Sequence, residues 1–261
     1  MHYQMWIWSK FENVIAHFLI AMMEELIILY YVLFYMFLLM YYHYNNIISY
    51  KEVAYMGKIK LLHGSDHIIE KPDLLLGKTN NDYGRGFYCT QELSMAMEWA
   101  CKKNSDGFVN KYVLEQDSLN ILNLLDGKYN ILHWMALLLK NRTFRLSNEI
   151  AIDACDYIIE NFSIDLKAYD VIIGYRADDS YFSFAESFVQ NGLPLRSLNE
   201  ALHLGRLGTQ TVLISEKSFR NLTFDGADFA DKTVYYPKFI ARDSNVRETY
   251  RREIRNRHSY K

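Results

Sequence analysis

The chain has 261 residues, enough for one large domain, or one domain with an appendage, to bury a substantial core. Its formal net charge of −2 at pH 7 gives no indication of a nucleic-acid partner. The three cysteines, Cys89, Cys101 and Cys155, are odd in number and lack both Cys-x-x-Cys spacing and Cys/His ligand spacing. This pattern argues against a disulfide framework and against a zinc site, and it favours a cytoplasmic protein without a metal.

The beginning of the chain differs in composition from the rest. Residues 26–42, LIILYYVLFYMFLLMYY, form an uninterrupted apolar and aromatic run close to the minimum of about 17 residues needed to cross a bilayer. The many tyrosines argue against the centre of a membrane span, and Glu24 and Glu25 just before the run argue against a signal peptide. The remaining interpretations are a membrane-associated or packed helix, or sequence that lies upstream of the true translation start.

The upstream interpretation depends on Met56. The codons for residues 51–53, Lys-Glu-Val, can contain a strong bacterial ribosome-binding sequence, and Met56 follows at a normal distance for initiation. Under this hypothesis residues 1–55 are an apolar extension outside the fold. We expect the folded domain at residues 56–236 and a basic C-terminal tail at residues 237–261.

Apolar periodicity after Met56 predicts a mixture of strands and helices. A short strand, Ile59–Leu62, ends at His63, and Thr90 is a good N-cap for a helix from Gln91 to about Lys103. Further strands are predicted at residues 108–114 (central in its sheet), 119–122, 169–175 and 209–215. Further helices are predicted at residues 131–139, 149–160, 181–190 and 198–204, the last capped by Ser197. Because strands and helices do not alternate regularly, the pattern predicts an α+β fold.

The C-terminal segment is basic. From Lys238 onward it carries Arg242, Arg247, Arg251, Arg252, Arg255, Arg257 and Lys261 against three acidic residues. Two interpretations fit, a solvated helix with pairs such as Glu248–Arg252 and a nucleic-acid-binding tail, and the pattern favours the helix.

Two short segments carry the candidate chemistry. His63, Gly64 and Ser65 end the first predicted strand, and a glycine-punctuated turn with Gly86 leads into Tyr88. An imidazole can donate or accept a hydrogen bond, a glycine exposes its backbone, and a phenol ring offers a flat face. Together these groups could hold a ribose and a planar heterocycle, which predicts a site for a nicotinamide dinucleotide.

Each of these residues also has a structural interpretation. His63 could be a satisfied histidine at a strand end, and Gly84 and Gly86 could serve a hairpin turn. Tyr88 could pack in the core, since Phe87 and Tyr88 point to opposite faces of a strand and only one of them needs to face a ligand. Trp99 could also be a core residue.

The chain resembles the ADP-ribosyltransferase superfamily in five segments: HGSDHIIEKPD, NDYGRGFYCT, GFVNKY, YDVIIGYRADDSYFSF and LGRLGTQTVL. The similarity is to the poly(ADP-ribose) polymerase and diphtheria-toxin side, which has a His-Tyr-Glu triad. Residues from about Leu61 to Phe219 look most similar to an uncharacterised bacterial domain-of-unknown-function family within it, often found beside small partner genes. The resemblance implies a split β-sandwich core with surrounding helices and NAD as co-substrate.

The resemblance also implies roles for individual residues. His63 matches the triad histidine that hydrogen-bonds the adenosine-side ribose, and the backbone of Gly64 matches the contact to the nicotinamide carboxamide. Tyr88 matches the triad tyrosine that stacks on the nicotinamide. Trp99 stands where the polymerases have a second aromatic residue, and Ala96 stands where they have a small hydroxyl residue, so one amide contact is lost or replaced.

The third triad position departs from the family pattern, because Gln210 stands in place of glutamate. The family's carboxylate favours the positive charge that develops on the ribose as the nicotinamide bond breaks. Gln210 can hydrogen-bond the ribose but brings no charge, which predicts slower chemistry, transfer of a single unit, or a carboxylate from elsewhere. Glu216 would lie about 20 Å further along the same strand. Asp178 and Asp179 are therefore the candidate acidic helpers, although they could equally cap the following helix.

We therefore expect an NAD-dependent mono-ADP-ribosyltransferase, a bacterial toxin or effector that modifies an intracellular macromolecule. Its expected partners are NAD, an unidentified acceptor and a neutralising partner protein, as in a toxin–antitoxin pair. One alternative is a non-catalytic module that binds NAD, ADP-ribose or a protein partner, which Gln210 favours. Another is a membrane-anchored protein, which requires residues 26–42 to be translated and inserted.

Overall fold

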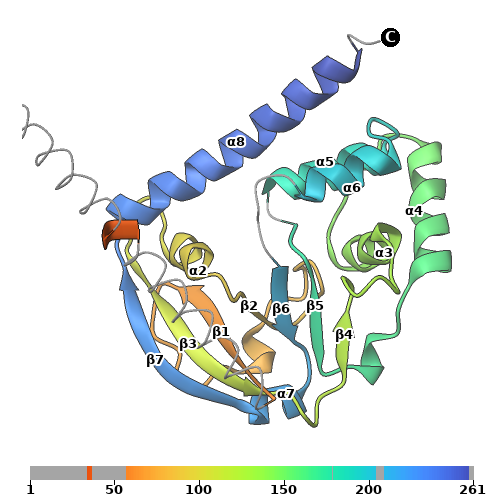
Figure 1. Cartoon of the computed structure of the whole chain (residues 1–261). Helices are drawn as coiled ribbons and strands as arrows, with labels where there is room; N and C mark the ends of the chain where they lie inside the picture. Colours follow the sequence, from red (N-terminus) through yellow and green to blue (C-terminus); the bar gives the residue numbers. More distant parts are fainter. Residues whose placement is uncertain (1–33, 37–56, 178, 204–208, 259–261) are drawn as a thin grey trace, which may run out of the picture. The chain divides into compact units, whose positions relative to one another are not determined.

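The computed structural model describes residues 34–36, 57–177, 179–203 and 209–258 (Figure 1). The chain divides into two units, Met1–Met56 and Gly57–Lys261. Of the first unit only residues 34–36 are described, as a short piece of helix with exposed side chains. No helix within the described ranges is long and apolar enough to cross a membrane. Except for residues 34–36, the predicted apolar segment 26–42 lies outside the described residues.

The second unit has an α+β fold built on two β-sheets (Figure 1). The first sheet is antiparallel, with the order β1 (Lys58–Ser65), β3 (Gly107–Glu115) and β7 (Leu222–Ala230). The second sheet has the order β2 (Phe87–Cys89), β6 (Thr209–Leu213), β5 (Val171–Tyr175) and β4 (Ile121–Asn123). Its β4 and β5 are parallel, and its other pairs are antiparallel. A bridge between Leu62 and Thr90 brings β1 beside the chain that leaves β2.

Different helices lie beside the two sheets (Figure 1). The helices are α2 (Leu93–Ala100), α3 (Ile131–Asn141), α4 (Glu149–Phe162), α5 (Asp179–Val189), α6 (Leu195–His203), α7 (Glu216–Arg220) and α8 (Lys232–His258). Helix α2 packs on β1 and β3, whereas α3 to α6 gather beside the second sheet. Helix α8 contacts both α2 and α5. The largest apolar cluster lies on this second side and includes the fully buried Trp134, Ile172 and Tyr181. Tyr88 and Trp99, which pack against this cluster, also line a cavity, so the cavity lies beside a well-packed core.

The structure confirms the predicted α+β class and most of the predicted elements. Strand β3 is the centre of its sheet, as its alternating pattern predicts. Strand β1 runs on to Ser65, so His63 lies within a strand and not after one. The basic C-terminal segment forms α8, which begins at Lys232 and continues through the expected boundary between residues 236 and 237.

Three local predictions are wrong. The N-cap of α2 is Glu92, because Thr90 is buried in the bridge to Leu62 and accepts a hydrogen bond from the Glu92 amide instead. Ser197 lies inside α6, which begins at Leu195. Glu216 does not continue β6, because Ser215 caps a new helix, α7, at that point.

Strand β7 is absent from the sequence prediction. Its sequence, LTFDGADFA, contains two aspartates and a glycine, residues that are depleted in strands. The strand pairs with β3 at the edge of its sheet, where polar side chains are tolerated, and Asp228 forms an ion pair with Lys111 there (2.7 Å). Pairing with β3 is thus what makes this segment a strand.

Candidate functional site

A cavity of about 700 Å³ lies where β1, β2, β6 and the loop before β2 meet. His63, Gly64, Tyr88, Trp99 and Gln210 line it together, and so do the predicted residues Ser65 and Gly86. A volume of this size is usual for a small-molecule site. The described structure thus brings together predicted residues that are widely separated in the chain.

The His63 ring is held in one tautomer. Its Nδ1 lies 2.7 Å from the backbone oxygen of Tyr88, and the ring stacks on Phe87 with centroids 4.4 Å apart. Because a carbonyl oxygen only accepts, Nδ1 carries the hydrogen and Nε2 is left as an acceptor. Burial lowers the pKa of His63, with the hydrogen bond to Tyr88 opposing this effect. The side chain is therefore a neutral imidazole that can accept a hydrogen bond from a ligand.

The Tyr88 hydroxyl is used by the protein itself. It donates to the backbone oxygen of Gly84 (2.7 Å) and accepts from the backbone amide of Tyr83 (3.0 Å). Burial raises the pKa of Tyr88, so the phenol stays protonated. These bonds fix the ring against the loop 83–87, and the ring face is then what Tyr88 can offer to a ligand.

Gly64 exposes a peptide group at the edge of β1. Leu62 and Thr90 exchange both backbone hydrogen bonds (2.8 and 2.9 Å), so the Leu62 peptide groups point toward the β2 side. Peptide groups of successive strand residues point alternately to the two sides of the strand. Gly64 lies two residues after Leu62, so its N–H and C=O also point toward the β2 side, past the Leu62–Thr90 bridge. A side chain at Gly64 would overlap the carbonyl oxygen of Ala96 in α2. Glycine here permits the close approach of α2 and leaves one donor and one acceptor at the cavity edge.

Trp99 lines the cavity, but one of its faces is covered. The guanidinium carbon of Arg176 lies 3.7 Å from the centroid of the Trp99 ring, which is a cation–π contact. Arg176 directly follows β5 and is buried. A ligand ring stacking in the expected place must therefore use the other face of Trp99 or the guanidinium plane. Sequence reasoning missed Arg176, although it lies in one of the segments that carry the family resemblance.

Gln210 is buried, and protein acceptors determine the direction of its amide. Its Nε2 donates to Oδ2 of Asp82 (3.2 Å) and to the backbone oxygen of Tyr175 (3.1 Å). Both partners are acceptors only, so the opposite orientation of the amide is excluded. The group that Gln210 can offer in the cavity is its carbonyl oxygen, Oε1.

Asp82 places a carboxylate in the site. It is buried, its Oδ1 pairs with Arg142 (2.8 Å), and its Oδ2 also accepts from the Ala177 amide (2.9 Å). Sequence analysis missed this residue, although it stands in the segment that contains Tyr88. Asp178 lies outside the described residues, and of Asp179 only its backbone place at the start of α5 is described. Their role as acidic helpers stays a prediction.

The cavity wall carries more positive than negative side chains. Five cations and three acids line it: Lys71, Lys78, Lys102, Arg142 and Arg176 against Asp66, Asp73 and Asp82. Lys102 pairs with Asp66 (2.8 Å), and this hydrogen bond is the main cause that lowers the pKa of Asp66 to about 2. The balance favours an anionic ligand.

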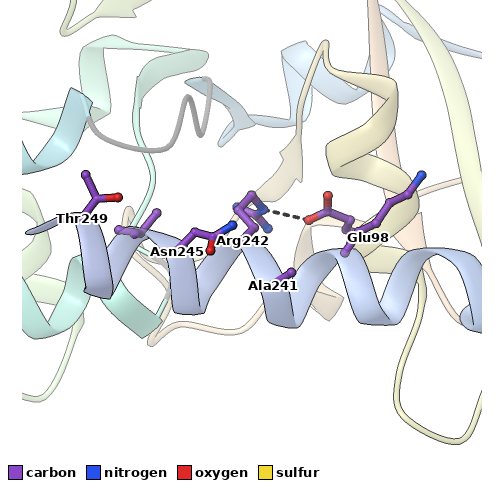
Figure 2. A pocket seen from close by; sticks show the side chains of 7 residues that line it. Glu98, Ala241, Arg242, Asn245 and Thr249 are labelled. Atoms are coloured by element: carbon purple, nitrogen blue, oxygen red, sulfur yellow. Dashed lines mark hydrogen bonds and ion pairs between the residues drawn. The ribbon is translucent and has the colours of Figure 1, made fainter.

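Figure 2 shows a smaller pocket, of about 390 Å³, between α2 and α8. Its central feature is the ion pair between Glu98 and Arg242 (2.7 Å), which joins the two helices. Both side chains are largely buried, so the pair has a structural role in holding α8. None of the predicted site residues lines this pocket, and the candidate site is therefore the larger cavity.

A family model described as "Protein of unknown function (DUF3990)" matches residues 59–224. The chain belongs to this family. The match begins in β1, ends in β7 and includes all the cavity residues named above. It agrees with the expectation that the chain belongs to an uncharacterised family. Comparison with curated proteins and with solved structures finds no significant match.

Proposed function

We propose that this DUF3990 protein is an NAD-dependent mono-ADP-ribosyltransferase that modifies an intracellular macromolecule, with a toxin-like action. One observation carries the proposal: His63, Tyr88 and Gln210, from three distant segments, line a single cavity of about 700 Å³. The two neighbouring sheets support it as well, because the resemblance to the superfamily implies a split β-sandwich core.

The cavity groups match the parts of NAD. Nε2 of the neutral His63 can accept from a hydroxyl of the adenosine-side ribose. The peptide groups of Gly64 match a primary carboxamide, which itself has donors and an acceptor. The Tyr88 ring can stack on the nicotinamide, a contact worth about 0.5–1.5 kcal/mol beyond burial. The excess of cations suits the pyrophosphate.

The reaction requires cleavage of the bond between nicotinamide nitrogen and ribose. The bonding electrons leave with the nicotinamide, which becomes neutral, and the ribose carbon becomes cationic. An acceptor nucleophile then bonds to that carbon and loses its proton. In this scheme the Oε1 atom of Gln210 accepts from a ribose hydroxyl and orients the sugar, and its partial negative charge favours the cationic ribose.

A second candidate function is binding of NAD or ADP-ribose without turnover. Two observations favour it. Gln210 brings no formal charge, and the guanidinium of Arg176 lies against Trp99, where it would repel a cationic nicotinamide ring. ADP-ribose lacks that ring and would avoid this repulsion.

The test compares nicotinamide release from NAD, and transfer of label from NAD to lysate macromolecules, for the full chain and for His63→Ala. Loss of one hydrogen bond in a buried site costs about 1–3 kcal/mol, so release should fall by about 5- to 150-fold. His133→Ala is the matched control, because His133 lies in the first turn of α3 and does not line the cavity. NAD binding by calorimetry without release would select the second candidate. If the folded protein binds neither NAD nor ADP-ribose in the calorimeter and releases no nicotinamide, both candidates are overturned.

A further inference from the structure

We propose that Asp82 is the positioning residue of this site: it holds the Gln210 amide so that Oε1 acts as the acceptor, and it supplies the negative charge that Gln210 lacks. This inference rests on the proposed function, because it assigns how the third triad position works in this chain. The two residues are 128 positions apart in the chain and meet through Nε2 and Oδ2 at 3.2 Å.

The direction of the Gln210 amide decides which of its atoms a ligand can meet. An amide side chain offers a donor end and an acceptor end, and a glutamate offers acceptors only. Asp82 and the Tyr175 carbonyl provide acceptors for both hydrogens on Nε2 of Gln210. Because its donor end is held in this way, Gln210 offers the acceptor Oε1 to a ligand. A glutamate would also offer an acceptor oxygen there.

Asp82 also brings negative charge to the site. A charge-assisted hydrogen bond to Nε2 polarises the amide and increases the negative charge on Oε1. Asp82 itself is buried and lines the cavity, so its charge is poorly screened by water. Its pairing with Arg142 offsets part of that charge and fixes the carboxylate in place.

The Asp82 carboxylate contacts groups other than Gln210 as well. Among the described residues its hydrogen-bond partners are all donors: the guanidinium of Arg142, the Ala177 amide and the Gln210 amide. An asparagine at this position would have to turn its own amide hydrogens toward one of these donors. Asp82→Asn therefore loses at least one of the three contacts without changing the size of the side chain.

The inference changes the expected effect of Gln210→Glu. A carboxylate at that position would face both the Asp82 carboxylate and the Tyr175 carbonyl, and two carboxylates in one site repel each other. Gln210→Glu should therefore have a lower kcat than the wild type. A higher kcat would overturn the inference, because it would mean that the site only lacks the family's glutamate.

The experiment measures nicotinamide release by the full chain at varied NAD concentration. For Asp82→Asn we expect kcat to fall by about 10- to 100-fold while KM changes little, because the charge acts on the cationic ribose of the transition state. Asp170→Asn is the matched control, since Asp170 is equally buried and pairs with Ser215 and Lys217 away from the cavity. Asp170→Asn should lose stability and keep its kcat. A kcat for Asp82→Asn within twofold of the wild type, or a fall no larger than in the control, would overturn the inference.

A second readout does not require turnover. The side-chain amide signals of Gln210 in a ¹⁵N–¹H spectrum, assigned by their absence in Gln210→Glu, should shift and exchange faster in Asp82→Asn but not in Asp170→Asn. If the wild type releases no nicotinamide, the proposed transferase function fails. The Gln210 signals still show whether Asp82 holds the Gln210 amide. Unchanged Gln210 signals in Asp82→Asn would overturn its positioning role.

Discussion

The hydroxyl of Tyr88 gives the sharpest test of how the loop before β2 is held. Tyr88→Phe removes one oxygen atom and keeps the ring. The backbone amide of Tyr83 and the backbone oxygen of Gly84 would both lose their hydrogen-bond partner, and both residues are buried. Each unsatisfied buried group costs about 1–3 kcal/mol, so for the two groups we expect the free energy of unfolding to fall by about 2–6 kcal/mol.

Urea unfolding of the full chain, followed by circular dichroism, measures this loss as a shift of the midpoint at unchanged slope. For a unit of this size, each kcal/mol corresponds to about 2–4 °C in melting temperature, which predicts a Tm lower by about 4–24 °C. The matched control is Tyr157→Phe, because Tyr157 is 60% exposed on α4. Its stability should change by less than about 0.5 kcal/mol.

A Tyr88→Phe protein as stable as Tyr157→Phe would show that the Tyr88 hydroxyl does not hold the loop. NAD affinity, where binding is observed, separates the two roles of the side chain. The ring remains in Tyr88→Phe, so the affinity should stay within a small factor. A large loss of affinity at unchanged stability would mean that the hydroxyl contacts the ligand and not the loop.

Two further predictions concern neighbouring residues of β1. Burial lowers the pKa of His63 from 6.5, so below about pH 6.5 the unfolded chain takes up a proton that the folded chain does not. The free energy of unfolding should therefore fall as the pH decreases from 6.5, and it should fall less in His63→Gln; equal slopes for the two proteins would contradict this. Gly64→Ala would overlap the Ala96 carbonyl and bring Cβ within 2.6 Å of the Ala100 nitrogen. It should lose about 1–3 kcal/mol in urea unfolding, and a stability equal to the wild type would exclude the close approach of α2.

The class of the fold follows from local patterns in the sequence. Helices α3 and α4 show apolar residues at helical spacing, and both begin at an asparagine whose side chain accepts from a backbone amide of the first turn. Strand β3 alternates and was predicted as central. Such patterns are readable because each depends on residues a few positions apart. The failures, Thr90 and strand β7, occur where a partner distant in the chain decides the local structure.

The candidate site likewise contains residues that the sequence predicted and a residue that it did not. His63, Gly64, Tyr88 and Gln210 could be proposed from the sequence, because motif resemblance marks each within its own segment. The sequence did not indicate that Asp82 is the carboxylate beside Gln210.

Only the tertiary structure decided the surroundings of these residues. Strand β6 lies between β2 and β5, with Gln210 opposite Gly174, and this register brings the Gln210 amide to Asp82 and to the Tyr175 carbonyl. The contact of Arg176 with Trp99 likewise joins the end of β5 to α2. The sequence by itself determined the types of residue and the elements that carry them, because these depend on local spacing. It did not determine which side chains meet, because that depends on strand order and register between distant segments.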